Sequence, residues 1–249
     1  SRIFLVQDAK TKQIWALKHV ERNNSKDQRF LDQAIKEADI AQRVRSPYVR
    51  GIERVIKTRR ALVQISEVFL LMEYVDGISV EQHPPESFEQ ALDILLQTAK
   101  GLRHMHQCGF VHADMKPNNI VVNEAGSVKI IDLGQACATG TVKERIQGTP
   151  DYIAPEQVRR EQIVPKTDVY NFGATMYWVL TRQHIPTAFS KSDSSLSGSL
   201  DAAVLEKPTP ANEINPNIDE RLSDLLSDCV EPSQGKRPTM NEVADKPQH

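Results

Sequence analysis

The chain has 249 residues, of which 26% are charged and 39% hydrophobic, a balance that excludes a disordered or fibrous protein. The formal net charge of −2 gives no general reason to expect nucleic acid or an anionic membrane as a partner. No apolar run approaches a membrane span, and three widely spaced cysteines favour a reducing compartment. We therefore expect a cytoplasmic domain without membrane contact of its own, whose parent protein could still be tethered to a membrane.

The first part of the chain predicts strands and one long helix. Residues 2–7 and 13–20 are short, β-branched and aromatic-rich, and the turn-like residues 8–12 between them predict an antiparallel hairpin. Residues 27–44 carry apolar side chains at helical spacing, which predicts an amphipathic helix. Two further strands are expected at about 51–57 and 67–74.

The rest of the chain predicts mainly helix. Ser87, with Gln90 three residues later, forms a capping box that opens a helix ending near Gly109. Residues 120–122 and 128–131 predict a second hairpin. The apolar stretch 170–180 predicts a helix inside a large core, and 221–229 predict an amphipathic helix. Residues 190–217, rich in Ser, Asp, Asn and Pro, predict a mobile insert between helices.

Residues 111–121 read Val-His-Ala-Asp-Met-Lys-Pro-Asn-Asn-Ile-Val, and the Asp-x-Lys-Pro-x-Asn within them resembles the catalytic loop of the protein kinases, which implies phosphoryl transfer. The reaction develops charge on the phosphate oxygens, so it needs an acceptor near the nucleophile, a cation near the phosphate and oxygen ligands for magnesium. Asp114, Lys116 and Asn119 supply these three groups. Taken alone, the same string fits a solvated loop equally well.

Further motifs follow a fixed order along the chain. They are Ala16-Leu17-Lys18, Glu37, the stretch 69–77, Asp132-Leu133-Gly134, the stretch 148–156 ending in Ala-Pro-Glu, Asp168, and Arg237-Pro238. In this order and at these intervals, the chain resembles the eukaryotic-type Ser/Thr protein kinases, and Asp151 with Gln157 resembles the bacterial members. The resemblance implies an α+β, bilobal fold. Residues 1–75 would form the small sheet lobe with one helix, and 76–249 the larger, mainly helical lobe.

The resemblance also implies roles for the charged residues. Asp114 would act as catalytic base toward the substrate hydroxyl, and Lys116 would stabilise the γ-phosphate. Asn119 and Asp132 would bind Mg²⁺, with Mn²⁺ as an alternative ion. Lys18, held by Glu37, would contact the other phosphates of ATP.

The remaining family positions concern the adenine and the activation segment. Ile3, Ala16 and Val121 would enclose the adenine, Met72 would be the gatekeeper, and the backbone of Glu73 and Val75 would bind the base. For the apolar residues, a packing role without nucleotide stays open. Thr149 favours Ser/Thr specificity because it would contact Asp114 and Lys116. Glu156 with Arg237 would tie the activation segment to the large lobe, and Asp168 would anchor the catalytic loop.

Three features depart from the family pattern. Ala113 replaces the usual Arg before the catalytic Asp, so we expect no control through an Arg–phosphate pair, although Thr139 and Thr141 remain candidate phosphorylation sites. Leu133 replaces Phe. No glycine-rich loop precedes Ile3, so we expect this loop to lie outside the segment and the segment to bind ATP weakly.

The leading hypothesis is a Ser/Thr protein kinase that transfers the γ-phosphate of ATP to Ser or Thr hydroxyls of protein substrates. The alternative is a pseudokinase that serves as a nucleotide-binding or scaffold module, which Ala113 and the absent loop would support. A small-molecule kinase is less favoured, because Thr149, Ala154-Pro155-Glu156 and Arg237 belong to a peptide-binding activation segment.

Overall fold

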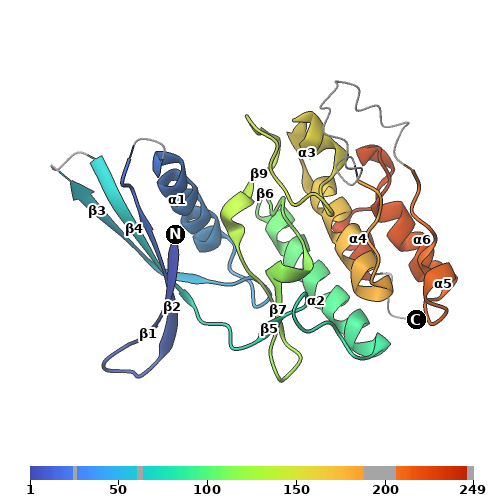
Figure 1. Cartoon of the computed structure of the whole chain (residues 1–249), viewed down its shortest axis with the longest axis horizontal. Helices are drawn as coiled ribbons and strands as arrows, with labels where there is room; N and C mark the ends of the chain where they lie inside the picture. Colours follow the sequence, from blue (N-terminus) through green and yellow to red (C-terminus); the bar gives the residue numbers. More distant parts are fainter. Residues whose placement is uncertain (25–26, 61–63, 188–205, 246–249) are drawn as a thin grey trace.

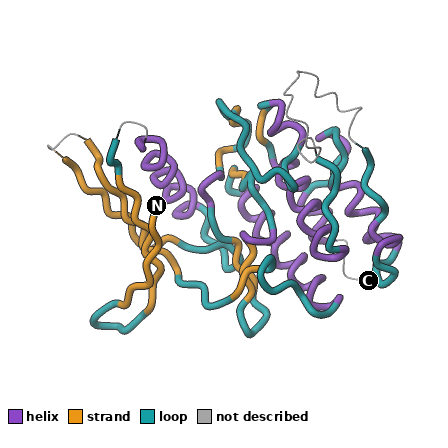
Figure 2. The backbone as a smooth tube through the Cα atoms, in the orientation of Figure 1, coloured by secondary structure: helices purple, strands orange, loops and turns teal. Residues whose placement is uncertain are grey.

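The computed structural model describes residues 1–24, 27–60, 64–187 and 206–245. A strand-rich N-terminal part with one long helix lies beside a larger, mainly helical part (Figure 1). This is the bilobal α+β arrangement that the sequence predicts. Figure 2 shows that the strands form one group in the N-terminal part and smaller groups near the middle of the molecule, while most helices lie on the C-terminal side.

The N-terminal lobe is built on a four-stranded antiparallel sheet in the order β1-β2-β4-β3. Its elements are β1 Arg2–Gln7, β2 Ile14–Glu21, α1 Gln28–Arg43, β3 Ile52–Arg60 and β4 Gln64–Glu73. One face of α1 packs on the sheet because its apolar residues recur at helical spacing. The hairpin and the helix are confirmed to within one residue at each end. The next two strands end at 60 and begin at 64, beyond the predicted 57 and 67.

The C-terminal lobe packs around one buried helix, α4. Its helices are α2 Phe88–Gln107, α3 Pro155–Arg159, α4 Pro165–Thr181, α5 Ala211–Ile214, α6 Glu220–Cys229 and α7 Met240–Asp245, with single 3₁₀ turns at Pro117–Asn119, Leu133–Gln135 and Gln234–Lys236. Nearly every residue of α4 is buried because α2, α6 and α7 all pack against it. The predicted core helix and the predicted amphipathic helix at 221–229 are therefore confirmed.

Short strands surround the catalytic stretch. They are β5 Ile78–Ser79, β6 Phe110–Val111, β7 Ile120–Val122, β8 Val128–Ile130, β9 Cys137–Ala138, β10 Thr141–Val142 and β11 Gln162–Ile163. β7 and β8 form the predicted second hairpin, and β5 joins them on the other side of β7. β6, just before the catalytic loop, pairs with β9, and β10 pairs with β11, so backbone pairing holds the entry to the loop and the segment that follows β9.

The N-terminus of α2 differs in one detail from the predicted capping box. Ser87 Oγ accepts a hydrogen bond from Gln90 N at 3.2 Å, as expected of an N-cap. The Gln90 side chain, however, accepts from Glu86 N at 2.9 Å rather than from Ser87 N. The N-cap is therefore present, but the Gln90 side chain bonds the backbone N–H of Glu86 instead of that of Ser87.

The predicted mobile insert at 190–217 lies partly outside the described residues. The described portion, from 206 onward, contains α5 and is packed. Tyr177 Oη donates to Thr209 O at 2.7 Å, and Asn215 Nδ2 donates to Leu180 O at 2.9 Å. The prediction is wrong for this portion, because both bonds tie it to α4. In the part of the chain that the structure describes, no helix has the length and apolar character needed to cross a bilayer.

Two backbone hydrogen bonds join the lobes beside the catalytic stretch. Between α1 and β3, Arg50 N donates to Ile130 O at 2.9 Å, and Ile130 N donates to Tyr48 O at 2.7 Å. After β4, Gly77 lies against β7, where an added Cβ would come within 2.5 Å of Val122 O. Glycine is required at this position because any side chain would collide with backbone.

Candidate active site

The backbone that enters the catalytic loop is fixed by one buried carboxylate. Asp168, on α4, accepts hydrogen bonds from His112 N and Ala113 N at 2.8 and 2.7 Å and contacts His106 Nε2 at 2.8 Å. Burial alone would raise the pKa of Asp168, but the hydrogen bond and charge of His106 outweigh it, so this pKa lies below its ordinary value. Ala113 adopts a φ of 61°, in the left-handed region that a residue other than glycine rarely occupies.

Asp114, Lys116 and Thr149 meet in one hydrogen-bonded cluster. Thr149 Oγ1 donates to Asp114 Oδ1 at 2.8 Å, and Lys116 Nζ donates to Thr149 Oγ1 at 3.0 Å. Lys116 Nζ also lies 3.5 Å from Asp114 Oδ2. The expected contact of Thr149 with the two charged residues is therefore present. A carboxylate and an ammonium side by side can bind a hydroxyl and a phosphate oxygen respectively.

Asn119 and Asp132 lie together on neighbouring backbone segments, since Ile131 N donates to Asn119 O at 2.9 Å. Asn119 Nδ2 donates to Asp114 O at 2.8 Å, so the amide oxygen is the candidate ligand atom of this side chain. Asp132 is exposed, and only its Oδ1 accepts a described hydrogen bond, from Gly134 N. Two hard oxygen donors with room for further ligands suit an ion that keeps several waters and binds phosphate, as Mg²⁺ does.

Helix α1 brings its glutamate to the strand lysine. Lys18 Nζ lies 2.6 Å from Glu37 Oε2, and the Glu37 side chain is almost fully buried. A second contact ties the same helix to the segment after Asp132, because Gln33 Nε2 donates to Gly134 O at 2.8 Å. The position of α1 is thus coupled to both the lysine and the candidate metal ligand.

The residues expected around adenine come from both lobes. Ile3 and Lys18 are partners in the β1–β2 ladder, and Ala16 and Met72 are partners in the β2–β4 ladder, so the four side chains share one face of the sheet. Ile3 is 63% exposed on this face, while Met72 is fully buried. Val121 lies in β7, against Gly77.

The two expected hinge residues, Glu73 and Val75, lie at the end of β4 and just after it. The Glu73 side chain pairs with Lys129 Nζ at 2.8 Å, a contact that the sequence does not suggest. This ion pair joins the end of the sheet to β8, so the segment between the lobes is held on the large-lobe side.

The activation segment is held without an arginine before Asp114. Ala113 is fully buried and packs with Val111, Ile163 and Cys137. Lys143 points its ammonium inward to the carbonyl of Gln135, and burial lowers the pKa of this lysine. Of the two candidate phosphorylation sites, Thr139 is exposed, and the hydroxyl of the half-buried Thr141 donates to Ala138 O at 2.6 Å.

The end of the segment is fixed by a buried ion pair. Arg237 binds Glu156 through both guanidinium nitrogens, at 2.7 and 2.9 Å, and both side chains are almost completely buried. Arg237 also donates to the carbonyl oxygens of Glu231, Lys166 and Pro232. The expected tie between the segment and the large lobe is therefore present.

The family description "Protein kinase domain" matches residues 1–248 of the chain. The chain belongs to the protein kinase family. A probable Ser/Thr protein kinase of Clostridium acetobutylicum is 28% identical over 240 residues, covering 93% of this chain and 35% of the relative. Ser/Thr protein kinase PknB of Mycobacterium tuberculosis is 28% identical over 271 residues, covering 98% of this chain and 42% of the relative. The chain thus spans less than half the length of these relatives.

A eukaryotic relative matches a smaller part of this kinase domain. A putative mitogen-activated protein kinase kinase kinase 7-like protein of Drosophila melanogaster is 30% identical over 184 residues, covering 70% of this chain and 47% of the relative. Protein kinases use ATP and a divalent metal ion, and they act on proteins. Asn119, Asp132 and Lys116 carry side chains of the chemical types that such a reaction requires.

Several residues of this kinase site were missed from the sequence. Gln157, noted only as a bacterial resemblance, donates to Ala113 O and accepts from Ala154 N, which links the catalytic loop to the activation segment. Gln33 and His106 make the contacts described above. Arg50 lines the small pocket between α1 and Asp132. The sequence around these residues does not indicate their roles, because their partners are brought near only when the chain folds.

Proposed function

We propose that this domain is a Ser/Thr protein kinase that transfers the γ-phosphate of ATP to hydroxyls of protein substrates, with residues 1–75 and 76–249 as its two lobes. The observation that carries the proposal is the cluster of Asp114, Lys116 and Thr149. Thr149 Oγ1 donates a hydrogen bond to Asp114 Oδ1, and this contact supports a role for the same carboxylate in accepting a hydrogen bond from a substrate hydroxyl. The relatives named as Ser/Thr kinases support the same substrate class.

In this mechanism, Asp114 accepts a hydrogen bond from the substrate hydroxyl and orients its oxygen toward the phosphorus. Lys116 Nζ lies 3.5 Å from Asp114 Oδ2, and its charge would offset the negative charge that develops on the γ-phosphate oxygens. Transfer is direct and in line, without a covalent intermediate on the protein. As the new oxygen–phosphorus bond forms, the bond between the γ-phosphorus and the β–γ bridging oxygen breaks, ADP leaves with that electron pair, and the proton of the hydroxyl passes to Asp114.

Asn119 and Asp132 would hold Mg²⁺ or Mn²⁺ through their side-chain oxygens, and the ion would neutralise phosphate charge. Lys18, fixed by Glu37, would contact the α- and β-phosphates. Ile3, Ala16 and Val121 would enclose the adenine, with the backbone of Glu73 and Val75 as its hydrogen-bond partners. Met72 would limit the depth of the pocket behind the base.

The decisive experiment measures transfer of labelled γ-phosphate from Mg-ATP to a basic acceptor protein by the full-length protein that contains this domain. Label on Ser and Thr that is lost in Asp132→Asn and in Asp114→Asn would support the proposal. Asp132→Asn activity above about one per cent of wild type would refute the metal assignment, because loss of a metal-ligand charge normally costs several kcal/mol. Nucleotide binding without transfer by the folded protein would support the pseudokinase alternative.

We further propose that the unphosphorylated domain is competent. The family's arginine before the catalytic Asp is replaced by Ala113, so a phosphate on Thr139 or Thr141 finds no cation there. The segment is instead held by the β6–β9 and β10–β11 pairs and by the inward-pointing Lys143. These contacts exist without any added charge.

A further inference from the structure

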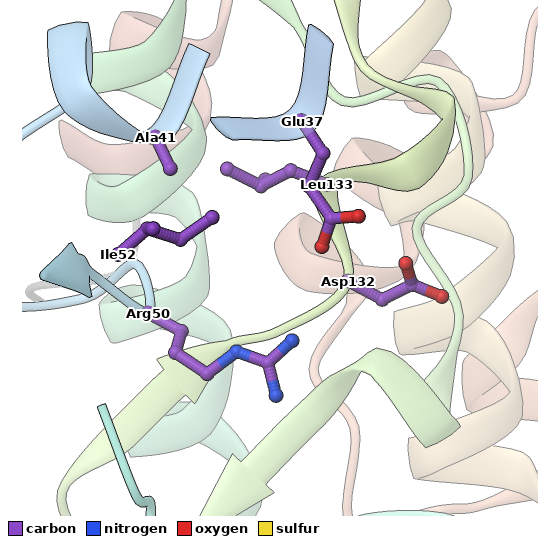
Figure 3. A pocket seen from close by; sticks show the side chains of 6 residues that line it. All are labelled: Glu37, Ala41, Arg50, Ile52, Asp132 and Leu133. Carbon is purple, nitrogen blue, oxygen red and sulfur yellow. The ribbon is translucent and has the colours of Figure 1, made fainter. Parts of the chain in front are cut away.

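Arg50 stands at the junction of the lobes, beside the candidate metal ligand. Its backbone N–H donates to Ile130 O, and Asp132 follows two residues after Ile130. The pairing of these segments therefore brings Arg50 and Asp132 to the same place. Figure 3 shows the Arg50 side chain extending into the pocket, with its guanidinium on the side of Glu37 and Asp132.

The guanidinium lies in a small pocket lined by Glu37, Ala41, Arg50, Ile52, Asp132 and Leu133. Burial lowers the pKa of Arg50, while the charges of Glu37, Asp132 and Glu73 raise it. An arginine in such a place stays protonated, since its ordinary pKa lies far above neutral pH. Among the described residues, its side chain has no hydrogen bond and no carboxylate within 4.0 Å.

The charges around the pocket are unevenly paired. Glu37 is paired with Lys18, and Glu73 with Lys129, each at less than 3 Å. Asp132 forms no ion pair within the described ranges of the chain and accepts only the hydrogen bond from Gly134 N. Among the described residues, Arg50 and Asp132 are therefore a cation and a carboxylate near each other that form no ion pair.

We propose that the positive charge of Arg50 weakens the binding of a free divalent ion at Asp132. The binding of the ion would then depend on the binding of the nucleotide. The inference rests on the proposed metal role of Asp132. A fixed positive charge in a partly buried site repels a second cation more than it would in water. The phosphates of ATP bring negative charge and oxygen ligands, which offset this repulsion. The ion would then bind mainly together with ATP.

The test is a titration of free Mn²⁺, followed by its electron paramagnetic resonance signal, against the purified protein. In Arg50→Met, the dissociation constant for Mn²⁺ should fall by at least about threefold, since the repulsion of a divalent ion is removed. Arg50→Lys keeps the charge and should bind Mn²⁺ as weakly as wild type. The matched control is Arg54→Met, at an exposed arginine of β3 that does not line the pocket, and it should leave the constant unchanged.

A second titration, with a non-hydrolysable ATP analogue present, measures the coupling. The gain in Mn²⁺ affinity caused by the nucleotide should be smaller in Arg50→Met than in wild type. Arg50→Gln replaces Arg50→Met if the methionine variant fails to fold. An unchanged or higher dissociation constant in a folded, uncharged variant overturns the inference.

The failure of the inference is distinguishable from failure of the metal site itself. Asp132→Asn should abolish the Mn²⁺ binding of both wild type and Arg50→Met. If Asp132→Asn binds Mn²⁺ as well as wild type does, the ion sits elsewhere and the proposed metal role of Asp132 is wrong. If Asp132→Asn loses the ion but Arg50→Met matches wild type, only the role of Arg50 is refuted.

Discussion

The buried pair of Glu156 and Arg237 allows a prediction whose size follows from the structure. In Glu156→Gln, Arg237 loses a negatively charged partner that accepted two hydrogen bonds at 2.7 and 2.9 Å. Removing one partner of a buried ion pair costs about 3–5 kcal/mol of unfolding free energy. Arg237 keeps its bonds to three carbonyl oxygens, so we expect the lower part of this range, about 3 kcal/mol.

The assay is equilibrium unfolding in urea, followed by two independent probes. With a slope of about 3 kcal/mol per molar urea for a chain of this size, the midpoint of Glu156→Gln should fall by about 1 M. The matched control is Asp39→Asn, which breaks the exposed pair of Asp39 with Arg43 and should cost under about 0.5 kcal/mol. A loss below about 1 kcal/mol in Glu156→Gln would refute the reasoning, because it would mean that the buried charge needs no partner.

The pH dependence of the same difference has a defined sign. Burial would raise the pKa of Glu156, but its hydrogen bonds and charge interaction with Arg237 outweigh this, so its folded-state pKa lies below the ordinary 4.5. The contribution of the charged carboxylate is therefore complete above pH 4.5 and is lost as the pH falls through the lower folded-state pKa. The stability gap between wild type and Glu156→Gln should be constant near neutral pH and shrink in acid.

Three further results are expected. Thr149→Val should lower kcat/KM by about 10- to 100-fold, because two hydrogen bonds to charged groups are lost. Thr149→Ser keeps the hydroxyl and should stay within about threefold of wild type. Equal activity of the two variants would contradict this. Gly77→Ala should reduce the unfolding free energy by about 1–3 kcal/mol, because its Cβ would meet Val122 O, whereas Gly235→Ala, with open space around it, should be near neutral in the same urea assay. Phosphatase treatment should leave the transfer rate within about twofold, since Ala113 offers no phosphate partner, and a large drop would speak against this.

The sequence predicted those parts of the site that belong to one local motif. Asp114, Lys116 and Asn119 lie within a few residues of one another, so their spacing limits their geometry. Lys18 and Glu37 were paired only through the family resemblance, and the structure places them 2.6 Å apart. The helices could be predicted equally well from the sequence, because a buried helix face requires apolar residues at a 3.6-residue repeat.

Contacts between remote polar residues were not predictable in this way. Glu73 was assigned a backbone role, yet its side chain pairs with Lys129, 56 residues further on. His106 reaches Asp168, 62 residues away, across two packed helices. A single histidine, lysine or glutamine has no periodicity, and its partner is decided by how the elements pack. The same holds for Arg50, which becomes significant only when the segment before β3 pairs with β8.

The interactions that hold the site differ in how they respond to added charge. Glu37 and Glu156 are already paired with Lys18 and Arg237, so these carboxylates are not free to bind an added cation. Lys143 is turned inward to a carbonyl and is likewise engaged. Arg50 is different, because it is charged and lies beside Asp132 without an ion pair. When a nucleotide binds with its ion, the electrostatic interactions of Arg50 and Asp132 should therefore change most. The paired residues would keep the lobes and the activation segment in place.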